Sequence, residues 1–305
     1  MAIFNRGRTL STLPTAFLGL AVYPENQVWP NVVAFVASAR RNSPTSEIVL
    51  ITSPLGSRDR AEFQRHGVSS LPLADPSPVG HEADPEHRQL RKQWVMSLYA
   101  KRHLHYAHAL EQMASRHVLL TDTRDVVVAG ELSALGAGRN LLLAQENVTL
   151  SLGSEPTNRS WIVKCYGQEE MERLHERRIL CAGTVYGPSD ALLVYVREMS
   201  QEFMRVGIVR ITEFGDQPVH NYLAYSGRLP VYEVSTAEAG GIKTIGLLPK
   251  RRFMLGWVRD SLALRARQKT VIYHQYDRHM NSRVFRWAFA HASADSNLQS
   301  YSDHQ

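Results

Sequence analysis

Short apolar runs alternate with segments of helical periodicity along most of the chain. Residues 16–23 and 47–52 are predominantly apolar, and each run has the length of a strand. Between them, residues 30–41 carry an apolar stripe and begin with a proline, which the first turn of a helix tolerates. Strands that alternate with helices in this way predict an α/β fold, in which a mainly parallel sheet is flanked by helices.

The same alternation continues toward the end of the chain. Further strands are predicted at residues 118–121, 140–145, 179–186, 229–234 and 270–273. Further helices are predicted at residues 58–66, 86–115, 188–206 and 216–225, with a helical pair that ends by residue 178. We expect a single domain over residues 15–292, preceded by an extension of residues 1–14. The polar tail of residues 293–305 is expected to be disordered, and residues 75–85 form a proline-rich loop.

Composition limits the classes of protein to consider. With 44% hydrophobic and 21% charged residues, the chain resembles an ordinary globular protein that buries a substantial core. The net charge of +6 suits an anionic ligand or membrane surface, but no nucleic-acid recognition motif accompanies it. Two cysteines, Cys165 and Cys181, are too few for a disulfide framework, which favours a reducing compartment. No apolar run approaches the ~18 residues of a membrane span, so we expect a cytoplasmic protein.

Two acids, Asp122 and Asp125, follow the predicted strand of residues 118–121. Ligands in open α/β sheets bind beyond the carboxyl ends of the strands, where these acids are expected. Two carboxylates so close repel each other unless they are exposed or a cation lies between them. A hard divalent ion such as Mg²⁺ or Mn²⁺, shared with a diphosphate, would offset the repulsion between the two carboxylates. The alternative is that Asp122 caps a turn and Asp125 pairs with Arg124 on the surface.

Four segments resemble motifs of the GT-A fold glycosyltransferases. Asp125, followed by three valines, resembles the end of their DxD motif, and LCAGTVYG at residues 180–187 resembles their donor-sugar segment. FGDQPVHN at residues 214–221 resembles the D-Q-x-x-x-N segment of the glycogenin-like and lipopolysaccharide-galactosyltransferase-like enzymes. VIYHQYDR at residues 271–278 is similar to their last strand, which ends in a metal-ligating histidine. The resemblance implies a GT-A, Rossmann-like fold from about residue 16 to residue 278.

A closer likeness is to a branch of glycosyltransferases that carry D-x-R-D, Asn-x-x-Trp-Ile, C-x-G-T and HQYDR. The second of these elements is Asn158 to Ile162 in this chain. The chain departs from the DxD pattern, because Thr123 occupies the place of the first Asp and Asp122 stands one position earlier. Asp125 is therefore the safer metal ligand, while Asp122 binds the metal, a ribose or a bridging water.

The resemblance implies a metal-dependent glycosyltransferase that moves a sugar from a nucleotide-diphosphate donor to a glycan, lipid-linked or other hydroxyl acceptor, with retention. Asp125 and His274, together with Asp122, are then the expected ligands of Mn²⁺ or Mg²⁺. Asp216 and Gln217 are the expected catalytic pair: Asp216 orients sugar hydroxyls, and Gln217 supports an oxocarbenium-like centre. Asp216 is also well suited to cap the helix that follows it.

Further residues are expected to contact the donor. These cofactor-binding candidates are Tyr23, Arg91, Asp122, Arg124, Cys181, Ala182, Gly183, Thr184 and Arg278. Arginine presents paired donors to phosphate, although Arg91 on a predicted helix could equally face solvent. Tyr23 is placed to stack on the base or to fill the core, and Gly183 allows close contact of the backbone with the sugar. The histidines of KRHLHYAHAL, at residues 101–110, are interpreted as a polar helix face.

Two other functions stay open. An aspartyl-phosphate phosphohydrolase also places an acid after an apolar strand, but it needs a second acid two positions on, where this chain has Arg124. The second open function is that of a non-catalytic nucleotide- or carbohydrate-binding module with a degenerate site. The basic stretch of residues 251–267 suits either a peripheral membrane contact or a solvated helix.

Overall fold

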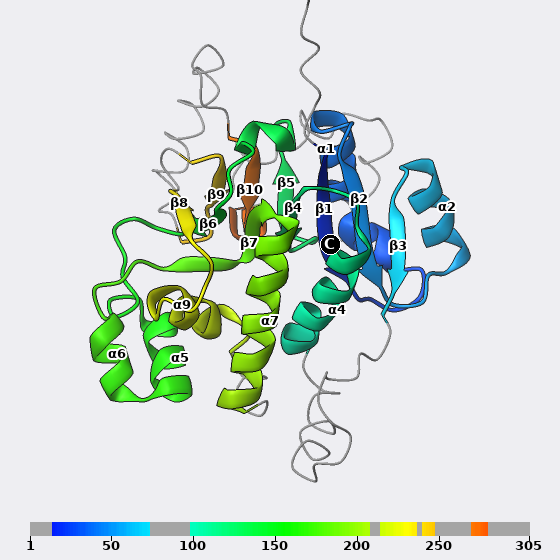
Figure 1. The fold of residues 1–305 in the computed structure, drawn as a ribbon. Helices are drawn as coiled ribbons and strands as arrows, with labels where there is room; N and C mark the ends of the chain where they lie inside the picture. The colour runs from blue at the N-terminus through cyan, green and yellow to red at the C-terminus, as the bar shows by residue number, and fades with distance from the viewer. Residues whose placement is uncertain (1–13, 74–97, 208–213, 237–239, 248–269, 280–305) are drawn as a thin grey trace, which may run out of the picture.

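A central sheet of seven strands organises the molecule, in the order β3-β2-β1-β4-β7-β6-β8 (Figure 1). The computed structural model describes residues 14–73, 98–207, 214–236, 240–247 and 270–279. The strands of the sheet are β1 Thr15–Ala21, β2 Glu47–Thr52, β3 Ser69–Pro72, β4 His117–Thr121, β6 Leu141–Gln145, β7 Leu180–Pro188 and β8 Tyr232–Ser235. Every neighbouring pair is parallel except those of β7, which runs antiparallel to β4 and β6.

A second sheet of three strands lies beside the first, in the order β5-β10-β9. Its strands are β5 Val126–Val128, β9 Ile242–Thr244 and β10 Ile272–His274. The helices are α1 Val28–Asn42, α2 Ser57–Arg65, α4 Leu98–Gln112, α5 Pro156–Tyr166, α6 Gln168–Leu174, α7 Ser189–Val206 and α9 Gln217–Tyr225, with short 3-10 helices η1 Leu132–Leu135 and η3 Tyr276–His279. Helices α4 and α7 pack side by side on one face of the central sheet, and α1 covers the other (Figure 1). The prediction of a mainly parallel α/β sheet flanked by helices is confirmed.

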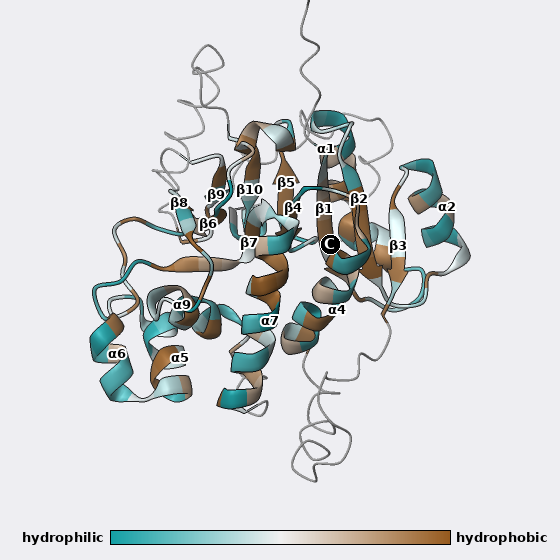
Figure 2. Ribbon diagram, viewed as in Figure 1, coloured by the Kyte–Doolittle hydropathy of each residue, from teal (hydrophilic) through white to brown (hydrophobic). Residues whose placement is uncertain are grey.

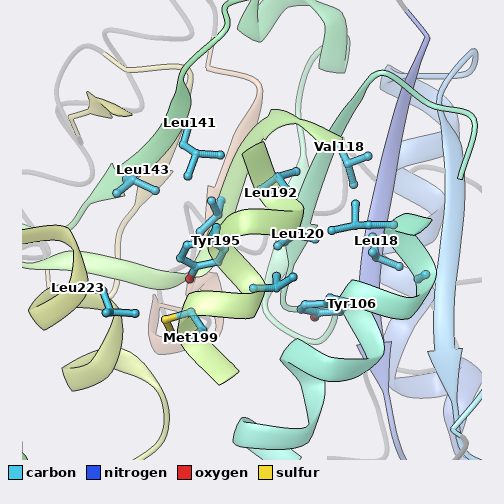
Figure 3. Packing of buried hydrophobic residues seen from close by; sticks show 14 of the residues in the cluster. Leu18, Tyr106, Val118, Leu120, Leu141, Leu143, Leu192, Tyr195, Met199 and Leu223 are labelled. Carbon is cyan, nitrogen blue, oxygen red and sulfur yellow. The ribbon is translucent and has the colours of Figure 1, made fainter. Parts of the chain in front are cut away.

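The core has two layers because side chains alternate across each strand. Leu18 of β1 and Leu120 of β4 pack beneath α4 and α7, where Tyr106 joins them (Figure 3). On the opposite face, Phe17 packs edge to face on Phe35 of α1, with ring centroids 5.6 Å apart. Strands buried on both faces are mainly apolar, as the brown central strands of Figure 2 show. Each such side chain stabilises the fold by roughly 1.5–3 kcal/mol, which makes β1 and β4 a rigid base for the groups at their carboxyl ends.

Most predicted elements are present, with shifted ends. Strand β2 matches its predicted bounds, and Gly67 follows α2 with a φ of 60°, as expected of a glycine that ends a helix. Helix α1 begins at Val28, so Pro30 is its third residue and still lies in the first turn. Three strands were not predicted: β3 has the polar sequence SSLP, and β5 and β9 have three residues each, too few to show a period.

Several predictions fall outside the described residues. These are the loop 75–85, the first part of the predicted helix 86–115 with Arg91, the basic stretch 251–267 and the tail 293–305. The described part of that helix is α4. No helix in the described part of the chain is long and apolar enough to span a membrane.

Candidate metal and donor site

The candidate site lies where the two sheets meet. Strands β4 and β6 flank the antiparallel β7 and run parallel to each other, so their carboxyl ends share one edge of the central sheet. The chain leaves β4 at Thr121, turns through residues 122–125 and enters the second sheet as β5. His274, the last residue of β10, pairs with Val126 of β5, and the amide of Gln275 donates to the carbonyl of Asp125 at 2.8 Å. The topology thus brings residue 274 to the turn after β4.

Asp122, Asp125 and His274 form a cluster whose ligating atoms all lie within 4.8 Å of one another. His274 Nε2 lies 3.3 Å from Asp122 Oδ2 and 3.6 Å from Asp125 Oδ1. Ligands of Mn²⁺ or Mg²⁺ lie about 2.1 Å from the ion, so neighbouring ligands of an octahedron are about 3 Å apart. The donor set of two carboxylates and one imidazole therefore fits such an ion with small side-chain adjustments.

The three side chains of the cluster differ in their exposure to solvent. The side chains of Asp122 and Asp125 are 35% and 16% exposed, whereas that of His274 is 1% exposed. The carboxylates therefore form the outer side of the cluster and the imidazole its floor. A ligand would reach the cluster from the side of the two acids.

The electrostatics of the cluster favour a positive charge between the acids. Burial lowers the pKa of His274, but Cys181, Asp122 and Asp125 outweigh it and raise that pKa well above its usual value. Burial raises the pKa of Asp125. For Asp122, burial is outweighed by the Arg102 guanidinium, which lowers the pKa of that carboxyl. A divalent cation would supply the same charge and would displace the proton from His274, because a ligating imidazole is neutral.

In the sequence D-T-R-D, the two residues between Asp122 and Asp125 point away from the cluster. Thr123 is 3% exposed, and its hydroxyl donates to the carbonyl of Leu20 at 3.0 Å. Arg124 points outward, and its Nη2 lies 3.0 Å from Asp277 Oδ2. Asp122 and Asp125 are thereby left to face the same histidine.

The alternative interpretation of the two acids is wrong in both parts. Arg124 pairs with Asp277, so it is not the surface partner of Asp125. The carboxylate of Asp122 contacts Arg102 and His274, so it does not act as a turn cap.

The predicted donor segment, residues 181–184, lies beside this cluster. The pairing of β6 with β7 jumps between Leu143 and Ala144, which leaves residues 182–184 unpaired with β6 in a bulge, while Cys181 still pairs with Ala144. A Cβ on Gly183 would lie 2.4 Å from His274 Cε1 and 2.5 Å from Asp122 Oδ2, so only glycine fits there without displacing those groups. Cys181 is buried, and its Sγ lies 3.3 Å from His274 Nδ1.

Ala182 and Thr184 complete the segment. The Ala182 amide donates to Gln217 Oε1 at 3.4 Å, so this residue faces the catalytic candidates through its backbone. Thr184 is completely buried, so its side chain is not accessible to a ligand.

Arg102, which the sequence did not single out, links the cluster to Asp216. Its Nη1 lies 2.7 Å from Asp122 Oδ1, and its Nη2 pairs with Asp216 Oδ2. Its Nη2 also donates to the carbonyl of Ala182 at 3.2 Å, and the residue as a whole is only 7% exposed. Burial would lower the pKa of Arg102, but Asp216 and Asp122 outweigh it and raise that pKa. Burial likewise raises the pKa of Asp216, yet Arg102 and His103 hold it well below its usual value.

Two interpretations of this region need correction. Asp216 occupies the N-cap position of α9, but its side chain makes no capping hydrogen bond because Arg102 and His103 engage it. His103 was assigned to a polar helix face, yet it is 1% exposed and its Nε2 lies 3.2 Å from Asp216 Oδ2. His105 is buried as well, and only His108 of the three is exposed.

Gln217 lies at the start of α9 in a cluster of polar side chains. Its Nε2 donates to Glu146 Oε1 at 2.9 Å and to Asn158 Oδ1 at 3.3 Å. Glu146 directly follows β6 and is 2% exposed, and burial raises its pKa. Glu146 was not predicted as a site residue, although it is an acid at the carboxyl end of a strand, as Asp122 is.

The remaining candidates lie around the rim or outside the described residues. Tyr23 is partly buried; burial raises its pKa, and Arg124, Asp125 and Asp122 also act on it, so it lies within electrostatic reach of the turn. Arg278 is exposed and rests against Gly246, where a Cβ would lie 2.8 Å from its Cδ.

The arrangement can hold a divalent cation beside the bulge of β7 and the side-chain amide of Gln217. A scan against models of protein families found no match, and a search of curated proteins also found none.

Proposed function

We propose that this protein is a metal-dependent glycosyltransferase of the GT-A fold, which moves a sugar from a nucleotide-diphosphate donor to a glycan or lipid-linked hydroxyl acceptor with retention. The observation that carries the proposal is the meeting of Asp122 and Asp125 with His274, a residue 152 positions from Asp122, at the carboxyl edge of a mainly parallel sheet. This is the juxtaposition that the motif resemblances predict. Had these residues been on opposite sides of the molecule, the proposal would have failed.

The proposed roles follow from the positions of the side chains. Asp122, Asp125 and His274 would hold Mn²⁺ or Mg²⁺, which neutralises the diphosphate as it leaves. Gln217 presents a fixed amide next to the bulge of β7 and would support the reacting sugar carbon. Asp216 is engaged by Arg102, so its role is to fix the start of α9 beside that carbon.

Rim residues would bind the rest of the donor. The guanidinium groups of Arg124 and Arg278 are exposed and suit phosphate or sugar hydroxyls, and Tyr23 suits the base. Arg91, which is not among the described residues, is also proposed to bind phosphate or sugar hydroxyls. The backbone of residues 181–184 would approach the sugar, with Gly183 permitting close contact.

An aspartyl-phosphate phosphohydrolase is less well supported. Its nucleophile would be Asp122, whose two oxygens are held by Arg102 and His274. The second acid of that mechanism would stand at position 124, where the side chain is an arginine that pairs with Asp277. Both observations favour transfer over phosphomonoester hydrolysis.

We further propose that the protein works in the cytoplasm, at the membrane periphery when the acceptor is lipid-linked. Support comes from the two cysteines, which are buried and not joined in a disulfide, as expected in a reducing compartment. The membrane contact would involve the basic residues 251–267, which lie outside the described residues.

The test is donor hydrolysis with a panel of UDP-, GDP- and other activated sugars in the presence of Mn²⁺. The proposal expects slow release of free nucleotide from at least one donor and loss of that release in EDTA. Asp125→Ala and His274→Ala should abolish the release while the melting temperature stays near that of the wild type. Glu176→Ala, which changes a highly exposed acid after α6, is the matched control and should keep full activity.

Three results would contradict the proposal. Normal turnover by either site variant would show that the metal cluster is not the site. Release of phosphate from simple phosphomonoesters would support the phosphohydrolase. Tight donor binding without any turnover would support a non-catalytic module.

A further inference from the structure

The side-chain amide of Gln217 is held at both ends. Its Oε1 accepts from the Ala182 amide at 3.4 Å, and its Nε2 donates to Glu146 and Asn158. We propose that Glu146 is a positioning residue, which holds and polarises this amide so that its carbonyl oxygen faces the reacting sugar. The inference rests on the proposed glycosyltransferase function and deepens it, since Glu146 belongs to none of the motifs that suggested that function.

The backbone of β7 fixes which way the amide points. A main-chain N–H can only donate, so the group that faces Ala182 must be the oxygen of Gln217. The amide nitrogen must then point away from the bulge, toward Glu146 and Asn158. Ala182 precedes Gly183, which lies against Asp122 and His274, so the oxygen of Gln217 is bound one residue along β7 from the metal cluster.

Asn158 is oriented independently of Gln217. Its side-chain Nδ2 donates to Glu155 Oε2 at 2.7 Å, and its main-chain N–H donates to the same oxygen at 2.7 Å. Glu155 is the N-cap of α5 and also accepts from the Thr157 amide. Asn158 therefore offers its oxygen to Gln217, and the nitrogen of Gln217 faces acceptors only.

The charge of Glu146 adds to this orientation. Gln217 is its only side-chain hydrogen-bond partner that we find among the described residues, and the glutamate is 2% exposed. A hydrogen bond from an amide N–H to a buried carboxylate is stronger than one to a neutral acceptor, and it polarises the amide toward its oxygen. Burial raises the pKa of Glu146 above its usual value, and the hydrogen bond from Gln217 and the nearby His274 and Arg278 only partly offset this. A more negative Gln217 oxygen would better stabilise positive charge on the sugar carbon.

The test is a double-mutant cycle of Glu146→Gln and Gln217→Ala, measured as kcat and donor KM for the donor that the wild type uses. Glu146→Gln keeps the shape and an acceptor oxygen but removes the charge. We expect kcat to fall about 10-fold with donor KM changed by less than about 3-fold. In the Gln217→Ala background the same change should alter kcat by less than about 2-fold, because the amide on which Glu146 acts is gone.

The matched control is Glu172→Gln. Glu172 also accepts from a glutamine side chain, since Gln168 Nε2 lies 3.2 Å from its Oε1, but this pair is exposed on α6. The control should leave kcat unchanged. If Glu146→Gln fails to fold, Glu146→Asp replaces it in the test. The shorter side chain keeps the charge but withdraws the charge from Gln217. Glu146→Asp should also lower kcat only when Gln217 is present.

The inference is overturned if the Glu146 variant keeps full kcat, or if kcat falls equally in both backgrounds. A wild type that releases nucleotide from no donor defeats the proposed function itself, and the positioning role of Glu146 with it. The contact is tested separately by the ¹⁵N side-chain amide resonances of Gln217, assigned by their loss in Gln217→Ala. These should shift in Glu146→Gln and stay in place in Glu172→Gln; unchanged resonances in the first variant would refute the contact.

Discussion

Replacing Gly183 by alanine tests the geometry of the metal cluster most directly. The added Cβ would lie 2.4 Å from His274 Cε1, 2.5 Å from Asp122 Oδ2 and 2.7 Å from His274 Nε2. Ordinary contacts between carbon atoms are about 3.5–4.0 Å, so these two side chains must move by about 1 Å. The variant therefore displaces two of the three proposed ligands without removing either.

The expected effects on stability and on metal binding differ in size. The crowded atoms are the ends of side chains, not main chain, so the free energy of unfolding should fall by only about 1 kcal/mol, the low end for overpacking. Metal sites tolerate ligand distances within about 0.2 Å, so a shift of about 1 Å should weaken Mn²⁺ binding at least ~10-fold, or about 1.4 kcal/mol.

Mn²⁺ affinity can be measured from the electron paramagnetic resonance signal of the free ion, and stability by thermal denaturation followed by circular dichroism. Gly138→Ala is the matched control, because a Cβ at Gly138 meets no atom of the described chain within 4 Å. It should leave both quantities unchanged. A folded Gly183→Ala protein that binds Mn²⁺ as tightly as the wild type would refute the reasoning.

Three further predictions concern stability. Arg102→Met removes the partner of the Asp122 and Asp216 carboxylates, so urea denaturation should show a loss of about 3–5 kcal/mol, and a loss below about 1 kcal/mol would contradict the bridge. Mn²⁺ at a hundred times its dissociation constant should stabilise the protein by about 2.7 kcal/mol and EDTA should reverse this; an unchanged melting temperature argues against a metal site. Burial lowers the pKa of His220 from 6.5 to about 4, so the unfolded chain takes up the proton first as the pH falls. About 3 kcal/mol of stability, present above pH 6.5, should be lost between pH 6.5 and 4, and His220→Gln should flatten that slope in denaturation curves.

The sequence predicts the strands that carry a long apolar run and misses β3, β5 and β9, which are polar or only three residues long. Strand β2 is found at its true ends because its apolar run EIVLIT is bounded by serines. Strand β3 lies at the edge of the sheet with one neighbour and mostly exposed side chains, so burial imposes no hydrophobic pattern on its serines. The second sheet is built from three-residue strands, and β10 pairs there with β5, which lies more than a hundred residues earlier in the sequence.

For the candidate site, the sequence brings forward residues at strand ends and misses residues that are buried by other elements. Asp122, Asp125 and His274 each end or follow an apolar run, and the structure does bring them together. Arg102 lies in a helix whose charges and histidines indicate a solvated face. It is buried because α7 packs against α4 and because Asp216, more than a hundred residues away, reaches it. Neither contact leaves a local pattern.

The ligand cluster also connects the two sheets. Asp122 follows a strand of the central sheet, whereas Asp125 precedes β5 and His274 ends β10, both in the second sheet. A cation held by all three would therefore fix the second sheet against the central one. It would do so at the turn 122–125, which links β4 to β5. Chelation should then affect the amides of β5 and β10 more than those of β1 and β2, which the core holds on both faces. Hydrogen exchange that responds to Mn²⁺ equally in all four strands would show that the ion binds without joining the sheets.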